Sequence, residues 1–290
     1  MIPHQEKHSR GAVVITGAST GIGKTSALHL DRLGFRVFAG VRKDPDGEHL
    51  KRESSGRITS LRIDVTDPST ITSAAGTVTN IVDGAGLAGL VNNAGIVVAG
   101  PLEFLPLDKI RQQFEVNVFG QLAVTQAFLP LLRKARGRIV NMGSISGRVS
   151  NPFIAPYSAS KFALESFTDA LRMELMPWGI SVSIIEPGNI ATPIWEKSIA
   201  ASDDLLSGLP PVAKELYGPV FTAVRKAAEK SGKGAIPAIV VARAVAHALS
   251  AKRPKTRYLI GRDARIQLIL RKLLPDRVMD RITMWYLGLG

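Results

Sequence analysis

Tyr157 and Lys161 are the residues whose types and spacing most directly suggest chemistry. In a helix, side chains four residues apart rise from one face with neighbouring Cβ atoms. A free tyrosine has a pKa of about 10. A positive charge ~4 Å away would favour its phenolate by roughly 4 kcal/mol at an effective dielectric of ~20. The pair could therefore act as a general acid–base, although the same spacing also describes an amphipathic tyrosine beside a solvated lysine.

A glycine-rich turn near the N-terminus could bind a phosphate group. Residues 12–16 read as a buried strand, and Gly17-Ala-Ser-Thr-Gly21-Ile-Gly23 leads into a helical segment that stops at Gly34. Strand, glycine turn and helix are typical of dinucleotide sites, because glycines admit the pyrophosphate and the helix start favours negative charge. An ordinary strand–helix connection is the alternative.

The same stretch also resembles a nucleotide-triphosphate loop. Residues 18–25 end in Gly23-Lys24-Thr25, as a Walker A loop does. That loop begins with glycine, whereas this segment begins with Ala18, and the chain has no further sign of an NTPase. We therefore favour a dinucleotide site.

Short apolar runs recur along the chain and define the fold class. Besides 12–16, we predict strands at 35–41, 58–63, 87–91, 138–142, 180–185 and 257–260, with helical segments between most of them, including one over 236–249. This alternation indicates an α/β fold with a doubly wound parallel sheet of about seven strands and helices on both faces. We predict one domain over residues 1–261 and a basic amphipathic C-terminal helical extension over 262–290.

Polar residues follow several of these strands, at the edge where open α/β sheets bind ligands. Ser144 follows the fifth strand, and Asn92-Asn93-Ala94-Gly95 ends the fourth as either a plain turn or part of a site. Asp64 could cap a helix or touch an adenine. Arg42 follows the second strand, where an acid would bind a ribose hydroxyl and an arginine favours a 2′-phosphate, unless this is a solvated turn. Asn117 lies among apolar residues in a helical region predicted from 107 to 135.

These motifs stand in one order, and over roughly residues 11–195 the chain resembles the short-chain dehydrogenase/reductase family, in particular steroid and retinol-type dehydrogenases and carbonyl reductases. The residues that carry the resemblance are Thr16, Gly17, Gly21, Gly23, Asp64, Val65, Asn92, Asn93, Ala94, Gly95, Asn117, Ser144, Tyr157, Lys161, Pro187, Gly188 and Thr192.

The resemblance implies a role for each catalytic residue. Tyr157 would be the general acid–base, and Ser144 would hydrogen-bond the substrate oxygen. Lys161 would bind the nicotinamide ribose and lower the tyrosine pKa, while Asn117 would support a proton-relay water. The implied cofactor-binding residues are Gly17, Ser19, Thr20, Gly21, Ile22, Gly23, Arg42, Asp64, Val65, Asn93, Ala94, Gly95, Tyr157, Lys161, Pro187, Gly188, Ile190 and Thr192, of which the loop from 187 to 192 would hold the nicotinamide carboxamide.

We therefore expect an oxidoreductase that transfers a hydride between NADP(H) and a hydrophobic alcohol or carbonyl. At Arg42 this chain resembles the NADP(H)-preferring members of the family. Some of those members have a second basic residue in the glycine turn, and Thr20 does not supply it. The alternatives are an NAD(H)-dependent hydroxysteroid or retinol-like dehydrogenase, and a non-catalytic nucleotide sensor. Such sensors typically lose the tyrosine–lysine pair, which is intact here.

By the same resemblance, residues of about 189–235 would form the substrate lid. Their apolar content suggests a hydrophobic substrate, unless these side chains only pack the lid's own helices. The apolar and aromatic residues concerned are Ile194, Trp195, Ile199, Leu205, Leu206, Leu209, Leu216, Tyr217, Val220 and Phe221.

Composition excludes several classes of protein. There is no cysteine, and the five histidines show no ligand spacing, so we expect no metal site. No apolar run reaches the ~18–20 residues of a membrane span, and the N-terminus has no signal-peptide core. We expect a cytoplasmic protein that forms a homo-oligomer, either a dimer or a tetramer.

The formal charge is +13, and much of it lies near the C-terminus. From Lys252 onward there are ten Lys or Arg and three Asp, so 10 − 3 = +7. A basic amphipathic tail can lie on an anionic membrane, which would make the protein peripheral, or it can pack on its own body or a subunit partner. No recognition motif supports nucleic-acid binding.

Overall fold

The protein is built around a seven-stranded parallel sheet. The computed structural model describes residues 10–194, 198, 208, 210–232 and 234–289. The strand order is β3-β2-β1-β4-β5-β6-β9, and every neighbouring pair is parallel. The strands are β1 (Ala12–Ile15), β2 (Arg36–Val41), β3 (Ile58–Arg62), β4 (Gly89–Asn92), β5 (Arg138–Met142), β6 (Ser181–Pro187) and β9 (Arg257–Ile260). This confirms the doubly wound sheet predicted from the apolar runs.

Helices cover both faces of the sheet, because successive strand residues point to opposite sides. The helices around the sheet are α1 (Gly21–Arg32), α2 (Asp44–Glu53), α3 (Pro68–Val82), α4 (Leu107–Phe114), α5 (Gly120–Ala135), α6 (Ala155–Glu174) and α9 (Ala238–Ser250). Val13 and Ile15 of β1 pack in one apolar core with α1 and α9, whereas Ala12 and Val14 pack in the other with α3 and α5.

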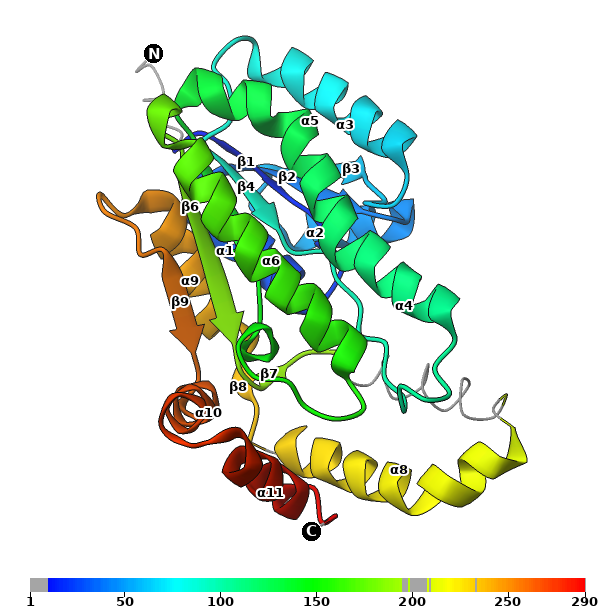
Figure 1. Cartoon of the computed structure of the whole chain (residues 1–290). Coiled ribbons are helices and arrows are strands. Elements are labelled where there is room, and N and C mark those ends of the chain that lie inside the picture. The colour runs from blue at the N-terminus through cyan, green and yellow to red at the C-terminus, as the bar shows by residue number, and fades with distance from the viewer. Residues whose placement is uncertain (1–9, 195–197, 199–207, 209, 233, 290) are drawn as a thin grey trace, which may run out of the picture.

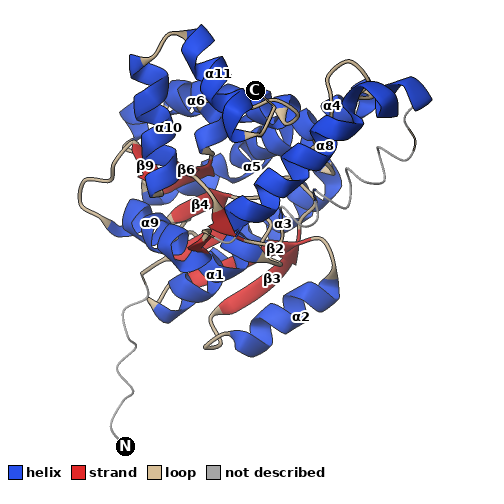
Figure 2. Ribbon diagram, turned by 90° about the horizontal axis from the view of Figure 1, so that it is seen from below, coloured by secondary structure: helices blue, strands red, loops and turns tan. Residues whose placement is uncertain are grey.

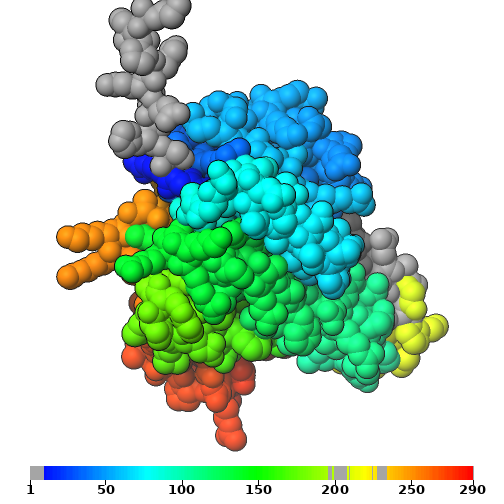
Figure 3. All heavy atoms as spheres, turned by 90° about the horizontal axis from the view of Figure 1, so that it is seen from above, coloured from blue at the N-terminus to red at the C-terminus, as the bar shows by residue number. Residues whose placement is uncertain are grey.

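The carboxyl ends of the strands point towards three further helices (Figure 1). These are α8 (Pro211–Gly232), α10 (Arg262–Leu273) and α11 (Asp276–Tyr286), and a short pair of strands, β7 (Ile190–Ala191) and β8 (Ile236–Pro237), lies beside them. Figure 2 looks onto this side of the molecule. Figure 3 shows the opposite side, where the turn near residue 250, coloured orange, projects from the surface.

Some predicted helices differ in detail. The helical region predicted from 107 to 135 is interrupted by a π-helical turn, η1 (Glu115–Phe119), which contains Asn117. The helix predicted from Ile236 begins at Ala238, because Ile236 and Pro237 pair with β7. Helix α2 was not predicted, since it buries only Gly47 and Leu50 and so shows little apolar periodicity.

The C-terminal extension forms two helices, which separate at Pro275, the N-cap of α11. Its first helix is attached to the body of the fold. Ala264 of α10 is fully buried and packs in a small apolar cluster with Ile145 and Val149, which follow β5. The start of the extension is therefore part of the packing beside Ser144.

Candidate active site

Two buried hydroxyl groups meet where β5 ends and α6 begins. Tyr157 lies in the first turn of α6, which has Pro156 near its start, as expected of a residue with a fixed φ. Ser144 is the N-cap of a short 3-10 helix, η2 (Ile145–Gly147), and its Oγ accepts a 3.1 Å hydrogen bond from the Ser146 N–H. The Ser144 hydroxyl lies close enough to the Tyr157 hydroxyl to lower the pKa of that phenol. The fold thus brings two buried hydroxyl groups together from two elements.

Lys161 lies over the Tyr157 ring. Its Nζ is 5.7 Å from the centre of the Tyr157 ring and donates a 2.6 Å hydrogen bond to the Met142 carbonyl of β5. Burial lowers the pKa of Lys161 to about 8, while the nearby charge of Glu165 acts in the opposite direction. The i, i+4 spacing therefore places the ammonium near the tyrosine ring.

The structure reverses the expected direction of the tyrosine pKa. Burial raises the pKa of Tyr157, and the neighbouring Ser144 hydroxyl lowers it only in part. A neighbouring ammonium favours the phenolate, but the loss of water around a buried phenol disfavours it. In the protein alone, desolvation outweighs the favourable neighbours.

Asn117 connects the sheet edge to the helix that carries Tyr157. Its fully buried side chain accepts from the Ile96 N–H at 2.9 Å and donates to the Ile96 carbonyl and to Ser160 Oγ, both at 3.1 Å. Ser160 in turn donates to the Tyr157 carbonyl at 2.7 Å. Both amide hydrogens of Asn117 are thus used, and the π turn around it is a helix irregularity that is frequent at functional sites.

The glycine turn is held by the segment that follows β4. The Asn93 side chain donates to the carbonyls of Thr16 and Gly17 at 2.9 and 3.1 Å. The Thr16 hydroxyl accepts from the N–H groups of Asn93 and Ala94, both at 3.0 Å. A Cβ on Gly23 would lie 2.2 Å from the Gly17 carbonyl oxygen, so only glycine fits there. Asn93 and Ala94 therefore hold the glycine turn in place through their hydrogen bonds with Thr16 and Gly17.

The loop after β6 reaches this turn. Gly21, with a φ of +56°, would bring a Cβ within 3.3 Å of Thr192. In the same loop, the Asn189 N–H donates to Asp263 of α10 at 2.7 Å, and a Cβ on Gly188 would lie 2.3 Å from that carboxylate. The structure thus brings together residues 17–23 and 187–192, and it adds Asp263 from the C-terminal extension.

The other predicted cofactor residues line or support the same edge. Arg42 is exposed at the end of β2 and makes no ion pair with another described residue. Asp64 acts as a local cap, since its Oδ1 accepts from the Thr66 N–H and hydroxyl at 3.0 and 2.7 Å. Ser19 and Gly95 are half-buried, Thr20 is exposed, Ile22 packs against the core, and Val65, Pro187 and Ile190 are buried.

The triphosphate-loop interpretation does not fit this geometry. Lys24, which would have to reach a phosphate, instead donates to Glu53 of α2 at 2.7 Å. Within the described residues no group of three or more His, Asp or Glu side chains is placed to hold a metal ion.

The residues present fit a dinucleotide. The Thr20 side chain makes no capping hydrogen bond to the N–H groups at the start of α1, and no acidic residue lies in the first turn. A helix start of this kind suits an anionic group. Gly17 and Gly21 both adopt positive φ, which gives the turn the shape that a side chain would hinder.

A family model described as short chain dehydrogenase matches residues 11–203. The chain belongs to this family. Among relatives, it is 37% identical over 283 residues to retinol dehydrogenase 5 of Mus musculus, covering 95% of this chain and 88% of that protein. It is 36% identical over 274 residues to the NADPH-dependent 3-dehydrocapnine reductase of Ornithobacterium rhinotracheale, covering 93% and 94%.

Solved structures agree with this assignment. A short chain dehydrogenase from Burkholderia cenocepacia in complex with NADP matches with a TM-score of 0.68 and 28% identity, covering 94% of this chain and 97% of that one. This short-chain dehydrogenase is therefore an NAD(P)-dependent oxidoreductase. The helices α8 to α11 lie beyond the part that the family model matches.

Sequence reasoning missed several residues that build this short-chain dehydrogenase site. Gln113 joins Val98 and Ile96 to α4 through hydrogen bonds of 2.7 and 2.8 Å, and Gln121 donates to the Ala94 carbonyl at 3.2 Å. For Gln121 the available signal was a polar residue inside an apolar helical stretch, whereas Gln113 stands among polar and charged residues and gave no signal. For Asp263 there was none, because its contact with residue 189 joins segments 74 positions apart.

Proposed function

We propose that this enzyme transfers a hydride between NADP(H) and a hydrophobic alcohol or carbonyl compound, with Tyr157 as its general acid–base. The observation that carries this proposal is the buried Tyr157 hydroxyl beside Ser144, with Lys161 Nζ 5.7 Å from the centre of the tyrosine ring. At the same edge of the sheet, Gly21 of the glycine turn lies against Thr192 of the loop from 187 to 192.

The protein's own side chains can exchange the proton of the reaction and stabilise the charge that develops on the substrate oxygen. Tyr157 exchanges a proton with the substrate oxygen, and Ser144 hydrogen-bonds the same oxygen as charge develops on it. Lys161 carries an ammonium at neutral pH, since its pKa is about 8. That charge stabilises the phenolate form of Tyr157 in a site from which water is excluded. The bound nicotinamide supplies or accepts the hydride.

The preference for NADP(H) rests on Arg42. Its guanidinium is exposed at the end of β2, without an ion pair to other described residues and without an acidic residue at that position. An arginine there can bind a 2′-phosphate. The named NADPH-dependent reductase and the NADP complex among the similar proteins support this choice.

The hydrophobic substrate is supported by an aromatic cluster between α8 and the body of the fold. The Tyr217 ring lies 5.9 Å from Phe104 and 6.3 Å from Phe153, and its hydroxyl donates to Glu103 at 2.7 Å. Phe153 has a φ of +67°, a strained conformation for a bulky residue that is often found where a site demands it. We propose that α8 is part of the lid over residues 189–235; Trp195, Ile199, Leu205, Leu206 and Leu209 lie outside the described residues.

A second candidate is an NAD(H)-dependent dehydrogenase for retinol-like or hydroxysteroid alcohols. The similarity to a retinol dehydrogenase favours it. A panel of retinoids, steroids, fatty alcohols and small ketones, assayed with both cofactors, separates the two. Turnover of small polar ketones alone would contradict a hydrophobic substrate.

Replacement of Tyr157 tests the proposed chemistry. Tyr157→Phe should reduce kcat by about 10²- to 10⁴-fold, because it removes the group that exchanges the proton. Cofactor binding, measured by fluorescence titration with NADPH, should persist. Tyr258→Phe is the matched control, since this buried tyrosine hydrogen-bonds His247 at 2.8 Å within β9 and α9. Near-normal turnover by Tyr157→Phe would refute the assignment.

We also propose a peripheral membrane contact through α10 and α11. Within the described residues no helix is long and apolar enough to cross a bilayer. Ile266, Ile269 and Leu273 are exposed along one side of α10, and Val278, Ile282 and Trp285 along one side of α11. Six basic residues accompany them, at positions 262, 265, 271, 272, 277 and 281. Such a surface suits an anionic membrane.

A homo-oligomer is supported by exposed apolar residues on the other helices. Phe162, Phe167 and Met173 of α6 and Phe119 of η1 are more than a third exposed, at 43%, 38%, 59% and 52%. Burying them against a second copy would remove apolar surface from water. Light scattering on the purified enzyme tests this, and a monomer at all accessible concentrations would contradict it.

A further inference from the structure

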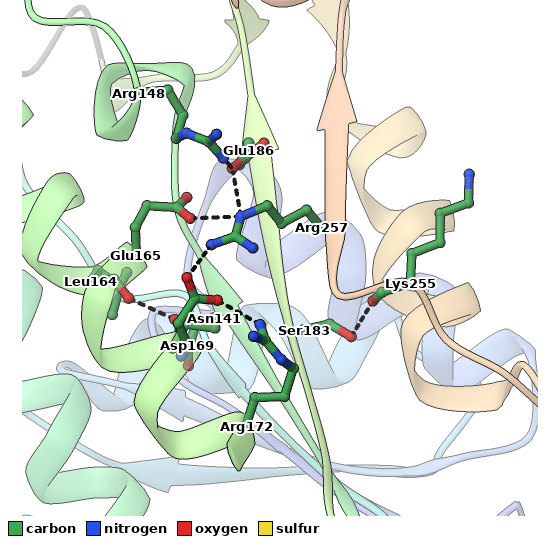
Figure 4. A network of polar contacts seen from close by, with 11 residues as sticks. Asn141, Arg148, Leu164, Glu165, Asp169, Arg172, Ser183, Glu186, Lys255 and Arg257 are labelled. Atoms are coloured by element: carbon green, nitrogen blue, oxygen red, sulfur yellow. Dashed lines mark hydrogen bonds and ion pairs between the residues drawn. The ribbon is translucent and has the colours of Figure 1, made fainter.

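A network of charged side chains joins Arg257 of β9 to Glu165 and Asp169 of α6, the helix that also carries Lys161 (Figure 4). Arg257 of β9 donates from Nε to Glu165 at 3.1 Å and from Nη2 to Asp169 at 2.6 Å, and its Nε lies 3.5 Å from Glu186. Arg148 donates to the same Glu186 oxygen at 2.9 Å. These groups come from α6, β6, β9 and the segment after η2.

Two of these elements also carry proposed catalytic or cofactor-binding residues: α6 carries Tyr157 and Lys161, and β6 ends at Pro187. Glu165 lies one helical turn after Lys161 on α6, and Glu186 directly precedes the loop that begins at Pro187. The Gly147 backbone packs on both turns of α6, since a Cβ there would lie 2.9 Å from the Lys161 carbonyl oxygen and 3.2 Å from Glu165 Cγ. The network is therefore connected to the site through α6, through the junction of Glu186 with Pro187, and through the Gly147 backbone.

Glu165 is the unusual member of this network. It and Glu186 are 7% and 1% exposed, and Glu165 Oε1 has no hydrogen-bond partner among the described residues. Two buried carboxylates side by side are expensive to ionise together. Burial and the neighbouring Glu186 raise the pKa of Glu165 to about 8, against the opposing charges of Arg257 and Arg148. Near neutral pH, the Glu165–Glu186 pair therefore holds a proton.

We propose that Glu165 is a positioning residue which keeps the Lys161 ammonium charged to higher pH, with Arg257 holding its carboxylate in place. This inference rests on the proposed function, in which Lys161 stabilises the Tyr157 phenolate. As pH rises, Glu165 loses its proton, and the new negative charge one turn away opposes the loss of the lysine proton. The charged groups that face Glu165 are those already named, namely Lys161, Asp169, Glu186, Arg257 and Arg148.

The decisive measurement is the titration of Lys161 itself, followed by nitrogen NMR of the NADP⁺-loaded enzyme with labelled lysine. Lys161→Arg assigns the signal. In Glu165→Gln, which keeps the size and removes the charge, the Lys161 midpoint should fall by about one pH unit. The alkaline midpoint of the pH profile of kcat, measured for oxidation of an alcohol from the substrate panel, should shift to lower pH by a similar amount. Glu165→Asp keeps the charge and should restore both.

Asp169→Asn is the matched control. Asp169 also accepts from Arg257 and lies on the same helix, but two turns from Lys161, so its loss should leave the Lys161 midpoint unchanged. Glu186→Gln should leave the midpoint unchanged or raise it, because Glu165 then ionises at lower pH. A purely structural role would instead disturb all three variants alike.

An unchanged Lys161 midpoint in Glu165→Gln overturns the proposal. If that variant does not fold, a lowered midpoint in Glu186→Gln overturns it instead. Loss of activity in Tyr157→Phe together with an unchanged Lys161 midpoint would reject only this inference, whereas normal activity in Tyr157→Phe would reject the proposed function.

Discussion

At the level of single residues, Tyr157 and Lys161 illustrate two opposing effects on charge. Their spacing predicted a favourable phenolate–ammonium pair, and α6 does place them on one face. Both side chains are nevertheless buried, and burial disfavours the charged form of each. The hydroxyl of Ser144 and the carboxylate of Glu165 offset this effect only in part. The surroundings of the pair therefore decide its protonation as much as the pair itself.

Arg42 is the residue on which cofactor preference should depend. Arg42→Gln removes the exposed guanidinium at the end of β2. A hydrogen bond to a charged group contributes about 1.5–3 kcal/mol, so KM for NADP(H) should rise by about 10- to 100-fold. KM for NAD(H) should change little. Steady-state kinetics with both cofactors measure this difference.

Arg36→Gln is a suitable control for that substitution, since Arg36 is also exposed and lies at the other end of the same strand. It should leave both KM values unchanged. Equal losses with NADP(H) and NAD(H) in Arg42→Gln would contradict a 2′-phosphate contact.

At the level of elements, helix α10 and the loop after β6 depend on each other. The Asn189 N–H is bound to Asp263 at 2.7 Å, and Gly188 passes so close to that carboxylate that a side chain cannot fit. The C-terminal extension thereby fixes the loop proposed to hold the nicotinamide. Truncation at Gly261 would remove both this support and the surface proposed to contact a membrane. Its effects on the loop and on membrane binding could therefore not be separated.

Gly188→Ala should displace the loop, because its Cβ would lie 2.3 Å from the Asp263 carboxylate. Losing the charge-assisted hydrogen bond to Asn189 should weaken cofactor binding by about tenfold or more, as measured by titration with NADPH. Gly76→Ala, which meets nothing within 4 Å, should have no such effect.

A second substitution checks the cause of that loss. In the double variant Gly188→Ala/Asp263→Ala the clash is removed. The substitution Gly188→Ala should therefore weaken NADPH binding strongly in the native chain, but far less in a chain that already carries Asp263→Ala. Independent, additive losses would show that the two residues do not act through their contact.

At the level of the whole molecule, the basic charge near the C-terminus divides between two sides. Lys252, Arg253 and Lys255 lie in the turn before β9, on the side opposite α10 and α11 (Figures 1 and 3). Arg257 belongs to the network with Glu165 and Glu186. The surface proposed to contact a membrane therefore carries the six basic residues of α10 and α11 and not all ten of the tail.

Polar replacement of two exposed residues tests this surface without disturbing Asp263. Leu273 and Trp285 are 74% and 75% exposed. The double variant Leu273→Ser/Trp285→Ser should bind vesicles of phosphatidylcholine and phosphatidylserine at least tenfold more weakly, because each large apolar side chain contributes about 1.5–3 kcal/mol when buried. Sedimentation with the vesicles measures the bound fraction.

Met176→Ser is the control for this measurement, because Met176 is 66% exposed but lies before the amino end of β6. It should bind like the native enzyme, and added salt should weaken both. Equal binding by the double variant and the control would exclude these two helices as the contact.

The sequence by itself determined the sheet and the order of the motifs. Apolar runs such as 138–142 become strands because a parallel sheet covered on both faces requires them to be apolar throughout. The position of Ser144 after one strand and of Tyr157 at the start of the next helix follows from the same local rules. Helix α2 escaped prediction because only Gly47 and Leu50 are buried in it.

Only the tertiary structure decided what surrounds these residues. The hydrogen bonds of Asn117 to Ile96 and Ser160, the hydrogen bond from Asn189 to Asp263, and the approach of Arg257 to Glu165 all join segments far apart in the chain. Local propensity contains no information about such contacts. Burial, which sets the protonation of Tyr157, Lys161 and Glu165, exists only once the helices have closed over the sheet.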